Sequence, residues 1–346
     1  MKTFYSEQHR AHAPQEEFEA GRMTPAVEVP ERVEAVRGRM VSRGLGPILP
    51  PSEFGPVPAL RIHDRAFVSF LQTAYARWTK MHPGVDAIPS VFSPQISALR
   101  GSDAGLRENV LAQLGHYCFD TGTPLTKGSW SAATAAVNIA LSAVRAIGDG
   151  EPAAFALTRP PGHHASATQF GGYCYLNNVA IAAQYLVDNG ARCAILDVDY
   201  HHGNGTQDIF YARDDVLFVS LHADPAFAYP VYWGAAEETG MGLGEGFNLN
   251  LPLPAATQWQ SYRLALDTAI ARIHAFFPDV LLVSLGLDTF ALDPICRFQL
   301  QTLDYLRLGE AIAQLRKPTA FVFEGGYDLA HLAENTVNVL EGYLGA

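Results

Sequence analysis

Asp199 and His201 lie two positions apart, directly after a short apolar run, and together they could bind a metal ion. In extended backbone, side chains two residues apart lie on the same face, so this carboxylate and this imidazole can reach one ion. Asp288, just beyond another apolar run, could supply a third ligand. Two carboxylates and one imidazole leave a fourth position for water or substrate, which is typical of a catalytic zinc site. The alternative is that Asp199 caps a strand end and that His201 is an ordinary loop histidine.

Two adjacent histidines, His163 and His164, follow the stiff turn Pro160–Gly162 after a further apolar run. A bound metal lowers the pKa of water to about 7, but a base must still accept the proton. This pair could supply the base, and Asp197 and Asn204 could orient the two rings. Metal ligation by the pair is the competing interpretation, and a turn histidine without a role is the third.

Tyr327 follows two glycines, so its phenol could be turned toward a bound substrate. There it would donate a hydrogen bond to a developing oxyanion. Packing without a chemical role is the alternative for this tyrosine. The aromatic loops Phe170–Tyr173 and Phe227–Pro230 could wall a narrow tunnel for an aliphatic chain, or could only pack locally.

Alternation of apolar runs with helical stretches predicts the elements that position these residues. The predicted strands are Ala153–Leu157, Ala194–Val198, Val216–Leu221, Val280–Leu285 and Thr319–Phe323. The predicted helices are Ser131–Ile147, Asn178–Asp188, Trp259–Phe276 and Leu303–Leu315. This pattern indicates an α/β fold with an open, mostly parallel multi-stranded sheet and helices on both faces. In such sheets ligands bind beyond the carboxyl ends of the strands, where the candidate residues stand.

Length and composition indicate one folded domain over residues 1–346. The chain has 24 Lys+Arg against 35 Asp+Glu, a formal net charge of −11, which argues against a nucleic-acid partner. The polar N-terminal segment predicts no signal peptide, and no apolar run predicts a membrane span. Four scattered cysteines without a CxxC pair suit a reducing compartment, so we expect a cytoplasmic protein.

The stretch from about residue 78 to residue 127 is rich in Pro, Gly and Ser and interrupts the alternation. A structureless stretch of this length inside a domain is usually functional or an interaction element. The alternative is a disordered surface insertion.

Four motifs in this order resemble the histone deacetylase superfamily: RPPGHHA at Arg159–Ala165, DVDYHHGNGTQ at Asp197–Gln207, GLDTFALDP at Gly286–Pro294 and EGGYD at Glu324–Asp328. With Asn204, the EGGY variant and the insertion, the chain is most similar to the bacterial acetylpolyamine amidohydrolase branch. The resemblance implies an arginase/deacetylase fold. It also implies that the insertion narrows the active-site mouth and contributes to a homodimer or a dimer of dimers.

The same resemblance implies residue roles. Zinc, with Fe²⁺ or Co²⁺ as substitutes, would be held by Asp199, His201 and Asp288. His163 and His164 would be electrostatic and general acid–base catalysts, and Tyr327 would polarise the scissile carbonyl. Structural potassium would bind at Asp197, Asp199, His201, Ser220 and Leu221, and a second potassium at Phe210, Arg213 and Val216. Gly172 would accept the substrate amide, between tunnel walls formed by Tyr173 and Tyr229.

One departure concerns substrate recognition. Relatives in the polyamine branch carry carboxylates on the insertion for the distal ammonium, and the matching positions here are Leu111 and Gly122, which are not acidic. Glu108 and Asp120 stand nearby and are expected to substitute for them.

The function expected is therefore zinc-dependent removal of acetyl groups from acetylated amines, with acetylpolyamines as the leading substrate class. Other small aryl or alkyl amides, or acetyl-lysine, could use the same machinery. A binuclear manganese ureohydrolase would need more Asp ligands. A non-catalytic module that reads acetylated ligands usually lacks a ligand, base or tyrosine, and all of these positions are filled here.

Overall fold

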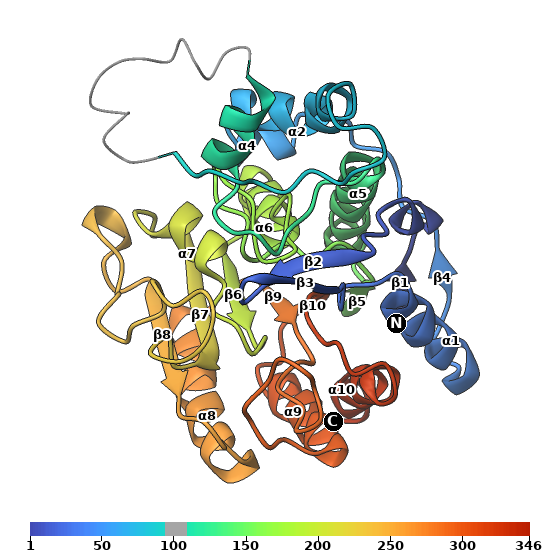
Figure 1. The fold of residues 1–346 in the computed structure, drawn as a ribbon. Helices are drawn as coiled ribbons and strands as arrows, with labels where there is room; N and C mark the ends of the chain where they lie inside the picture. The colour runs from blue at the N-terminus through green and yellow to red at the C-terminus, as the bar shows by residue number, and fades with distance from the viewer. Residues whose placement is uncertain (94–108) are drawn as a thin grey trace.

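The computed structural model describes residues 1–93 and 109–346. Its centre is an eight-stranded sheet in the order β4-β1-β5-β10-β9-β6-β7-β8, in which every neighbouring pair is parallel (Figure 1). From one edge to the other the strands are β4 (Ile48–Leu49), β1 (Lys2–Phe4), β5 (Ala153–Ala156), β10 (Thr319–Phe323), β9 (Val280–Leu285), β6 (Cys193–Asp197), β7 (Val216–Ala223) and β8 (Asn248–Leu253). The predicted α/β class with a parallel sheet is confirmed.

Helices cover both faces of the sheet, and the inner strands are buried throughout. On one face pack α2 (Arg65–Trp78), α4 (Val110–Tyr117), α5 (Ser129–Gly148) and α6 (Asn178–Asp188). On the other pack α1 (Glu31–Arg43), α8 (Trp259–Phe276), α9 (Thr302–Ala313) and α10 (Leu332–Gly345). Successive strand residues alternate between the two cores: Ile195 of β6 packs with the first, Ala194 and Leu196 with the second.

The five predicted strands and four predicted helices all form, and their ends lie within about two residues of the expected ones. The sequence pattern did not predict the outer strands β1, β4 and β8. β1 and β4 are only three and two residues long, and β8 alternates between buried and partly buried side chains instead of forming a continuous apolar run. Helices α1, α2, α4 and α10 and the short helix α7 (Asn204–Phe210) were also not predicted.

The described part of the Pro/Gly-rich stretch at 78–127 is ordered against the core, which differs from the expectation of a structureless segment. Ala87 and Leu125 form an antiparallel bridge with two 2.9 Å backbone hydrogen bonds. Helix α4 packs on α2, and Leu114 belongs to the first core. Apolar residues that lie between the prolines and glycines therefore anchor this stretch to the core, although the stretch has no long hydrophobic periodicity.

An antiparallel hairpin lies outside the main sheet. It pairs β2 (Glu16–Glu19) with β3 (Arg22–Pro25), and its turn places Ala20 and Gly21 in the left-handed region. Glu17, Phe18, Glu19 and Ala20 line the same cavity as Tyr327, so the hairpin covers the carboxyl ends of the central strands (Figure 1).

Helix α5 is long and apolar enough to cross a membrane by length and composition. Most of it is buried in the first core, against α6 and β5. The burial of α5 against the sheet and α6 therefore explains its hydrophobicity.

Close packing of α9 on α10 gives a stability prediction. A methyl group added at Gly309 would stand 2.0 Å from the Val339 carbonyl oxygen, whereas one added at the exposed Gly38 of α1 would meet nothing within 4 Å. We expect Gly309→Ala to lower the free energy of unfolding by about 1–3 kcal/mol, because the two helices must move apart. We expect Gly38→Ala to raise it by about 0.5–1 kcal/mol, because alanine favours the helix interior.

Urea unfolding of the two variants beside the unchanged protein measures both effects. Equal shifts of the same sign would contradict the packing argument.

Candidate active site

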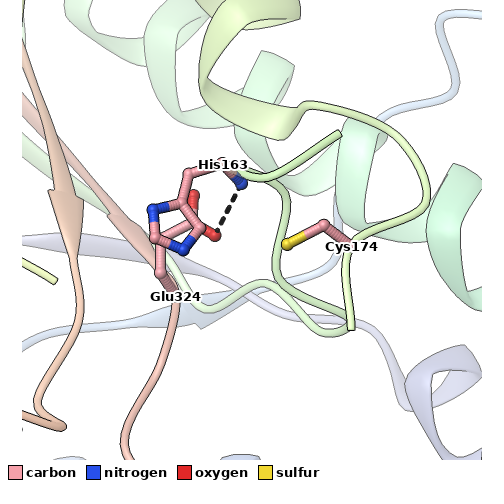
Figure 2. Close-up of side chains that lie close together, drawn as sticks. All are labelled: His163, Cys174 and Glu324. Carbon is pink, nitrogen blue, oxygen red and sulfur yellow. Dashed lines mark hydrogen bonds between the residues drawn. The ribbon is translucent and has the colours of Figure 1, made fainter. Parts of the chain in front are cut away.

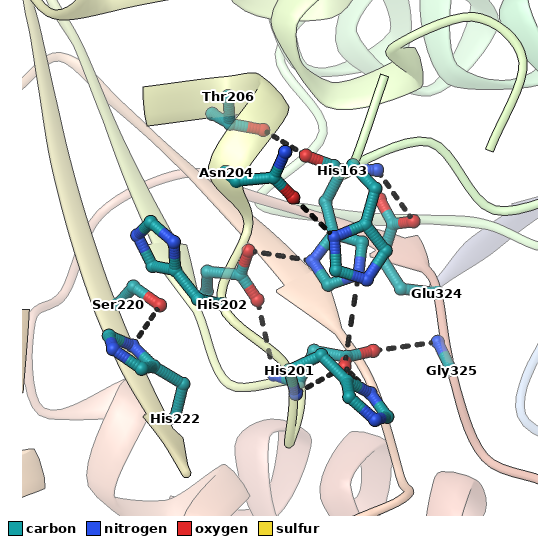
Figure 3. A network of polar contacts seen from close by, with 12 residues as sticks. His163, His201, His202, Asn204, Thr206, Ser220, His222, Glu324 and Gly325 are labelled. Carbon is teal, nitrogen blue, oxygen red and sulfur yellow. Dashed lines mark hydrogen bonds and ion pairs between the residues drawn. The ribbon is translucent and has the colours of Figure 1, made fainter. Parts of the chain in front are cut away.

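The candidate residues follow four strands that are neighbours in the sheet, β5, β10, β9 and β6. Their carboxyl ends therefore meet at one edge. The connection after β5 carries His163 and His164, the one after β6 carries Asp199 and His201, and those after β9 and β10 carry Asp288 and Tyr327. The structure brings all six together, and the polar network in Figure 3 includes His163 and His201.

Asp199, His201 and Asp288 form a buried group whose ligand atoms all lie within 4.8 Å of one another. The Nδ1 atom of His201 is 2.9 Å from Asp288 Oδ2 and 3.3 Å from Asp199 Oδ1. Backbone N–H groups hold the other carboxylate oxygens, from Gly325 to Asp199 at 2.9 Å and from Tyr200 to Asp288 at 2.8 Å. Each carboxylate is thus oriented by the main chain and keeps an oxygen for a cation.

The charges of this group fit a metal ion. Burial and the neighbouring Asp199 charge raise the pKa of Asp288 to about 7. Burial by itself would lower the pKa of His201, but its hydrogen bonds to Asp199 and Asp288 raise it to about 9. The His201 imidazole and the Asp288 carboxylate thus share a proton, and a metal cation bound to both could replace it. Two oxygen ligands and one nitrogen ligand, with His201 facing a cavity, match an open catalytic zinc site.

The two adjacent histidines differ in their partners. His163 Nδ1 is 3.0 Å from Asp197 Oδ2, whereas His164 Nδ1 is 2.7 Å from the neutral amide oxygen of Asn204. Burial would lower the pKa of His163, but the Asp199 and Asp197 carboxylates raise it to about 10. Burial and the charges of His163 and His201 keep the pKa of His164 well below its usual value. The pair is therefore split into a cationic and a neutral imidazole.

Glu324 ties the connection after β10 to the histidine turn. Its Oε2 accepts a hydrogen bond from the backbone N–H of Gly162 at 2.6 Å and a second from that of His163 at 3.3 Å, which Figure 2 shows. His163, Glu324 and Cys174 form a second group of close potential ligands. Burial raises the pKa of Cys174 well above its usual value and that of Glu324 to about 8. The Glu324 carboxyl group is thus engaged by the backbone of the histidine turn, and we assign this cluster to support of His163.

Contacts to its backbone and to its ring hold Tyr327 in place. Its backbone N–H donates to Asp293 Oδ2 at 2.6 Å, and the Arg32 guanidinium lies 4.7 Å from its ring centroid. The same guanidinium donates to the Gly326 and Glu324 carbonyl oxygens at 2.5 and 2.6 Å. Burial raises the pKa of Tyr327 well above its usual value, so the phenol keeps its proton and remains a hydrogen-bond donor.

A cavity of about 520 Å³ opens onto this centre. His164, His201 and Tyr327 line its inner part, and Gly172, Tyr173 and Tyr229 line it as expected for tunnel walls. The Tyr229 ring lies 5.0 Å from the His164 ring, and the Tyr173 ring lies 5.7 Å from that of Tyr327. Gly172 has a φ of +57°, and a Cβ there would stand 2.2 Å from His164 Cδ2, so only glycine fits this position.

The predicted replacements for the missing carboxylates have different outcomes. Asp120 lines the cavity, and its Oδ2 accepts hydrogen bonds from Gly172 N–H at 2.6 Å and the Tyr229 hydroxyl at 2.8 Å. Glu108 lies outside the described residues. Of the two positions that match the family's carboxylates, Gly122 lines the cavity, and Leu111 packs against the first core.

The residues predicted to hold potassium lie in two places. Asp197 and Ser220 are directly opposite each other in the β6–β7 register, with Leu221 next along β7. Phe210, Arg213 and Val216 lie in and around the connection from α7 to β7, where Arg213 N–H donates to the Phe210 carbonyl at 2.9 Å. Potassium at either place stays a prediction.

Four further residues were not predicted to have a role. Glu324 stands in the EGGYD motif, and its position directly after an apolar run could have drawn attention. Asp293 likewise stands in the GLDTFALDP motif. Arg32 and Glu17 give no such signal, because they meet the site only through tertiary contacts.

Comparisons with known proteins agree with this geometry. Residues 26–343 match the model of the histone deacetylase domain family. The chain is 48% identical to acetylpolyamine amidohydrolase 1 of Pseudomonas aeruginosa over 347 residues, covering 100% of this chain and 99% of the relative. It is 41% identical to the acetylpolyamine amidohydrolase of Mycoplana ramosa, with full coverage of both. The crystal structure of the Burkholderia pseudomallei acetylpolyamine aminohydrolase superposes with a TM-score of 0.93, at 40% identity, covering 99% of this chain and 98% of that one.

These matches confirm the predicted resemblance and the predicted enzyme class, a hydrolase acting on amide bonds. They extend over essentially the whole chain, including the four motifs that carry the candidate residues. The chain belongs to the histone deacetylase family.

Proposed function

We propose that this protein is a zinc-dependent amidohydrolase that removes acetyl groups from acetylated amines, and from acetylpolyamines in particular. The observation that carries the proposal is the convergence of an Asp-His-Asp group, a histidine pair and a buried tyrosine on one cavity. The names of the relatives support the substrate class.

Asp199, His201 and Asp288 would hold the zinc ion, with Fe²⁺ or Co²⁺ as substitutes. When bound, the ion supplies Lewis-acid polarisation of the acetyl carbonyl and a lowered pKa for the attacking water. The three side chains are fixed for this purpose by backbone donors and by one another.

His164 is the general base and acid of the proposal. It lines the cavity, and the neutral Asn204 leaves its imidazole uncharged. Its Nε2, opposite the nitrogen held by Asn204, would accept the proton of the attacking water and later deliver it to the leaving amine. His163, paired with Asp197 behind it, would stay cationic and stabilise the negative charge that develops on the acetyl group.

Tyr327 donates its hydroxyl proton in a hydrogen bond to the developing oxyanion. Arg32 and Asp293 hold the ring and the backbone of its loop in place before substrate arrives. Gly172 would accept the substrate amide N–H, and Tyr173 and Tyr229 would enclose the linker of the substrate.

The remaining expectations are part of the same proposal. Potassium at the two predicted places would stabilise the connections after β6 and α7. The 78–127 segment would narrow the mouth and contribute to a homodimer or dimer of dimers, and the protein would act in the cytoplasm.

Removal of the Tyr327 hydroxyl tests the oxyanion role. We expect Tyr327→Phe to lower kcat for N-acetylputrescine by about 10²–10³-fold with little change in KM, because one transition-state donor is lost. Steady-state kinetics measure this, with Tyr185→Phe on α6 as a control for the same chemical change away from the cavity. A Tyr327→Phe variant as fast as the unchanged protein would refute the role.

Metal removal tests the Asp-His-Asp group. We expect chelation to abolish deacetylation and zinc to restore it. Asp288→Asn should lose zinc at a chelator concentration that leaves the unchanged protein loaded, because one anionic ligand becomes neutral. Metal analysis of the dialysed proteins gives this result independently of activity.

The same preparations should be assayed with N-acetylputrescine, N-acetylcadaverine, an acetyl-lysine peptide and acetanilide. Turnover of the acetanilide alone would keep the amide chemistry and refute the polyamine substrate. Full activity of metal-free protein would refute the zinc site.

A further inference from the structure

The N-terminal hairpin places a buried carboxylate in the wall of the cavity. Glu17 of β2 is only 4% exposed, yet it lines the cavity together with Tyr173 and Tyr327. Glu16, the preceding residue, is exposed and does not line the cavity, and Glu17 alone among the four residues of β2 is buried. The hairpin thus turns one of two adjacent glutamates inward.

The partners of Glu17 within the described residues are neutral. Its Oε1 accepts the Tyr173 hydroxyl at 3.0 Å, and the Val27 backbone adds a weaker hydrogen bond. Burial is the main reason that the pKa of Glu17 is raised, to about 7. A carboxylate buried without a cationic partner is costly, and a cation bound beside it would stabilise its charged form.

The rim around Glu17 is acidic. Among the described residues that line the cavity, Glu17, Glu19 and Asp120 are acidic, and Arg297 is the one lysine or arginine. The Arg297 guanidinium is placed over the Phe227 ring, 5.6 Å from its centroid, rather than against a carboxylate. The mouth therefore favours a cationic group on the ligand.

Tyr173 connects this carboxylate to the reacting end of the cavity. Its ring packs edge-on against Tyr327, and its hydroxyl reaches Glu17. A short aliphatic linker lying along the Tyr173 ring would thus have its acetyl group near Tyr327 and its other end near Glu17.

Asp120 serves a different purpose. Its Oδ2 is occupied by two donors of the chain itself, Gly172 N–H and the Tyr229 hydroxyl, so its carboxylate fixes the position of the opposite wall. Glu17 has one side-chain donor and faces the cavity, which leaves it free to receive a ligand.

We propose that Glu17 is a specificity-determining residue whose carboxylate binds the distal ammonium of an acetylated diamine. The inference rests on the proposed function, and it assigns recognition of the ammonium to the N-terminal hairpin. Asp120 is a positioning residue that acts through Gly172 and Tyr229.

The test compares two substrates of equal length, N-acetylputrescine and N-pentylacetamide, which differ in a terminal ammonium or methyl group. In Glu17→Gln we expect the ratio of their kcat/KM values to fall about ten- to a hundredfold, mainly through KM for N-acetylputrescine, because a charge-assisted contact is lost. Glu16→Gln, with the same charge change on the outer face, should leave the ratio unchanged. Asp120→Asn should lower kcat/KM for both substrates and keep the ratio.

A second variant keeps the proposal testable if Glu17→Gln does not fold. Glu17→Asp keeps the charge but withdraws it by one methylene, so preference should move from N-acetylputrescine to the longer N-acetylcadaverine. Three results would each overturn the role of Glu17. They are an unchanged substrate preference in Glu17→Asp, an unchanged ratio of kcat/KM values in Glu17→Gln, and a fall of that ratio in Asp120→Asn instead. Absence of turnover of both acetamides by the zinc-loaded unchanged protein would overturn the proposed function itself.

Discussion

Four carboxylates buried within one short stretch of sheet edge are the constraint on which the rest of the site depends. Asp197, Asp199, Asp288 and Glu324 are all fully buried. Their mutual repulsion at low dielectric would unfold the edge unless positive charge or protons were supplied. The cationic His163, the proton shared by His201 and Asp288, and aligned backbone N–H groups meet this need. A divalent cation is the natural completion of such a cluster.

This requirement also explains the backbone around the cluster. A Cβ at Gly325 would stand 2.5 Å from Asp288 Oδ2, and one at Gly203 would stand 2.2 Å from Asp197 Oδ2. Only glycine lets the main chain pass beside these oxygens, and at Gly325 it also lets the backbone N–H donate to Asp199 Oδ2. The glycine-rich motifs thus let the main chain lie next to the buried carboxylates, where a residue with a side chain would not fit.

The sequence predicted the central strands and the convergence of the candidate residues well, because both have local signals. Continuous apolar runs such as Val280–Leu285 mark buried parallel strands, and the polar residues after them must meet at one edge. The outer strands were missed because two or three residues, as in β4 and β1, carry no periodicity. The helix α4 within the Pro/Gly-rich stretch was missed for a similar reason, since it has only eight residues.

The contacts that shape the substrate site could not be predicted because they join residues far apart in the chain. Glu17 meets Tyr173, Asp120 meets Tyr229, and Arg32 meets Tyr327, each across more than a hundred residues. Nothing in the residues around Glu17 distinguishes it from the exposed Glu16. The inward direction of its side chain follows from the register of β2 on β3 and from the place of the hairpin over the sheet.

Under the proposed function, chemistry and selectivity would depend on different parts of the fold. The candidate catalytic groups stand on connections of four central strands, which the whole core holds in place. The groups at the mouth come from the hairpin and from the 78–127 segment, which pack on the rim. Substitutions there can change the charge that faces a ligand while the carboxylate cluster and its cations keep their geometry. Because the two wall tyrosines donate to carboxylates of different segments, a change in either segment is transmitted to one wall at a time. Under the proposed function, this separation would let substitutions at the mouth change the selected amine while the amide-cleaving centre stays the same.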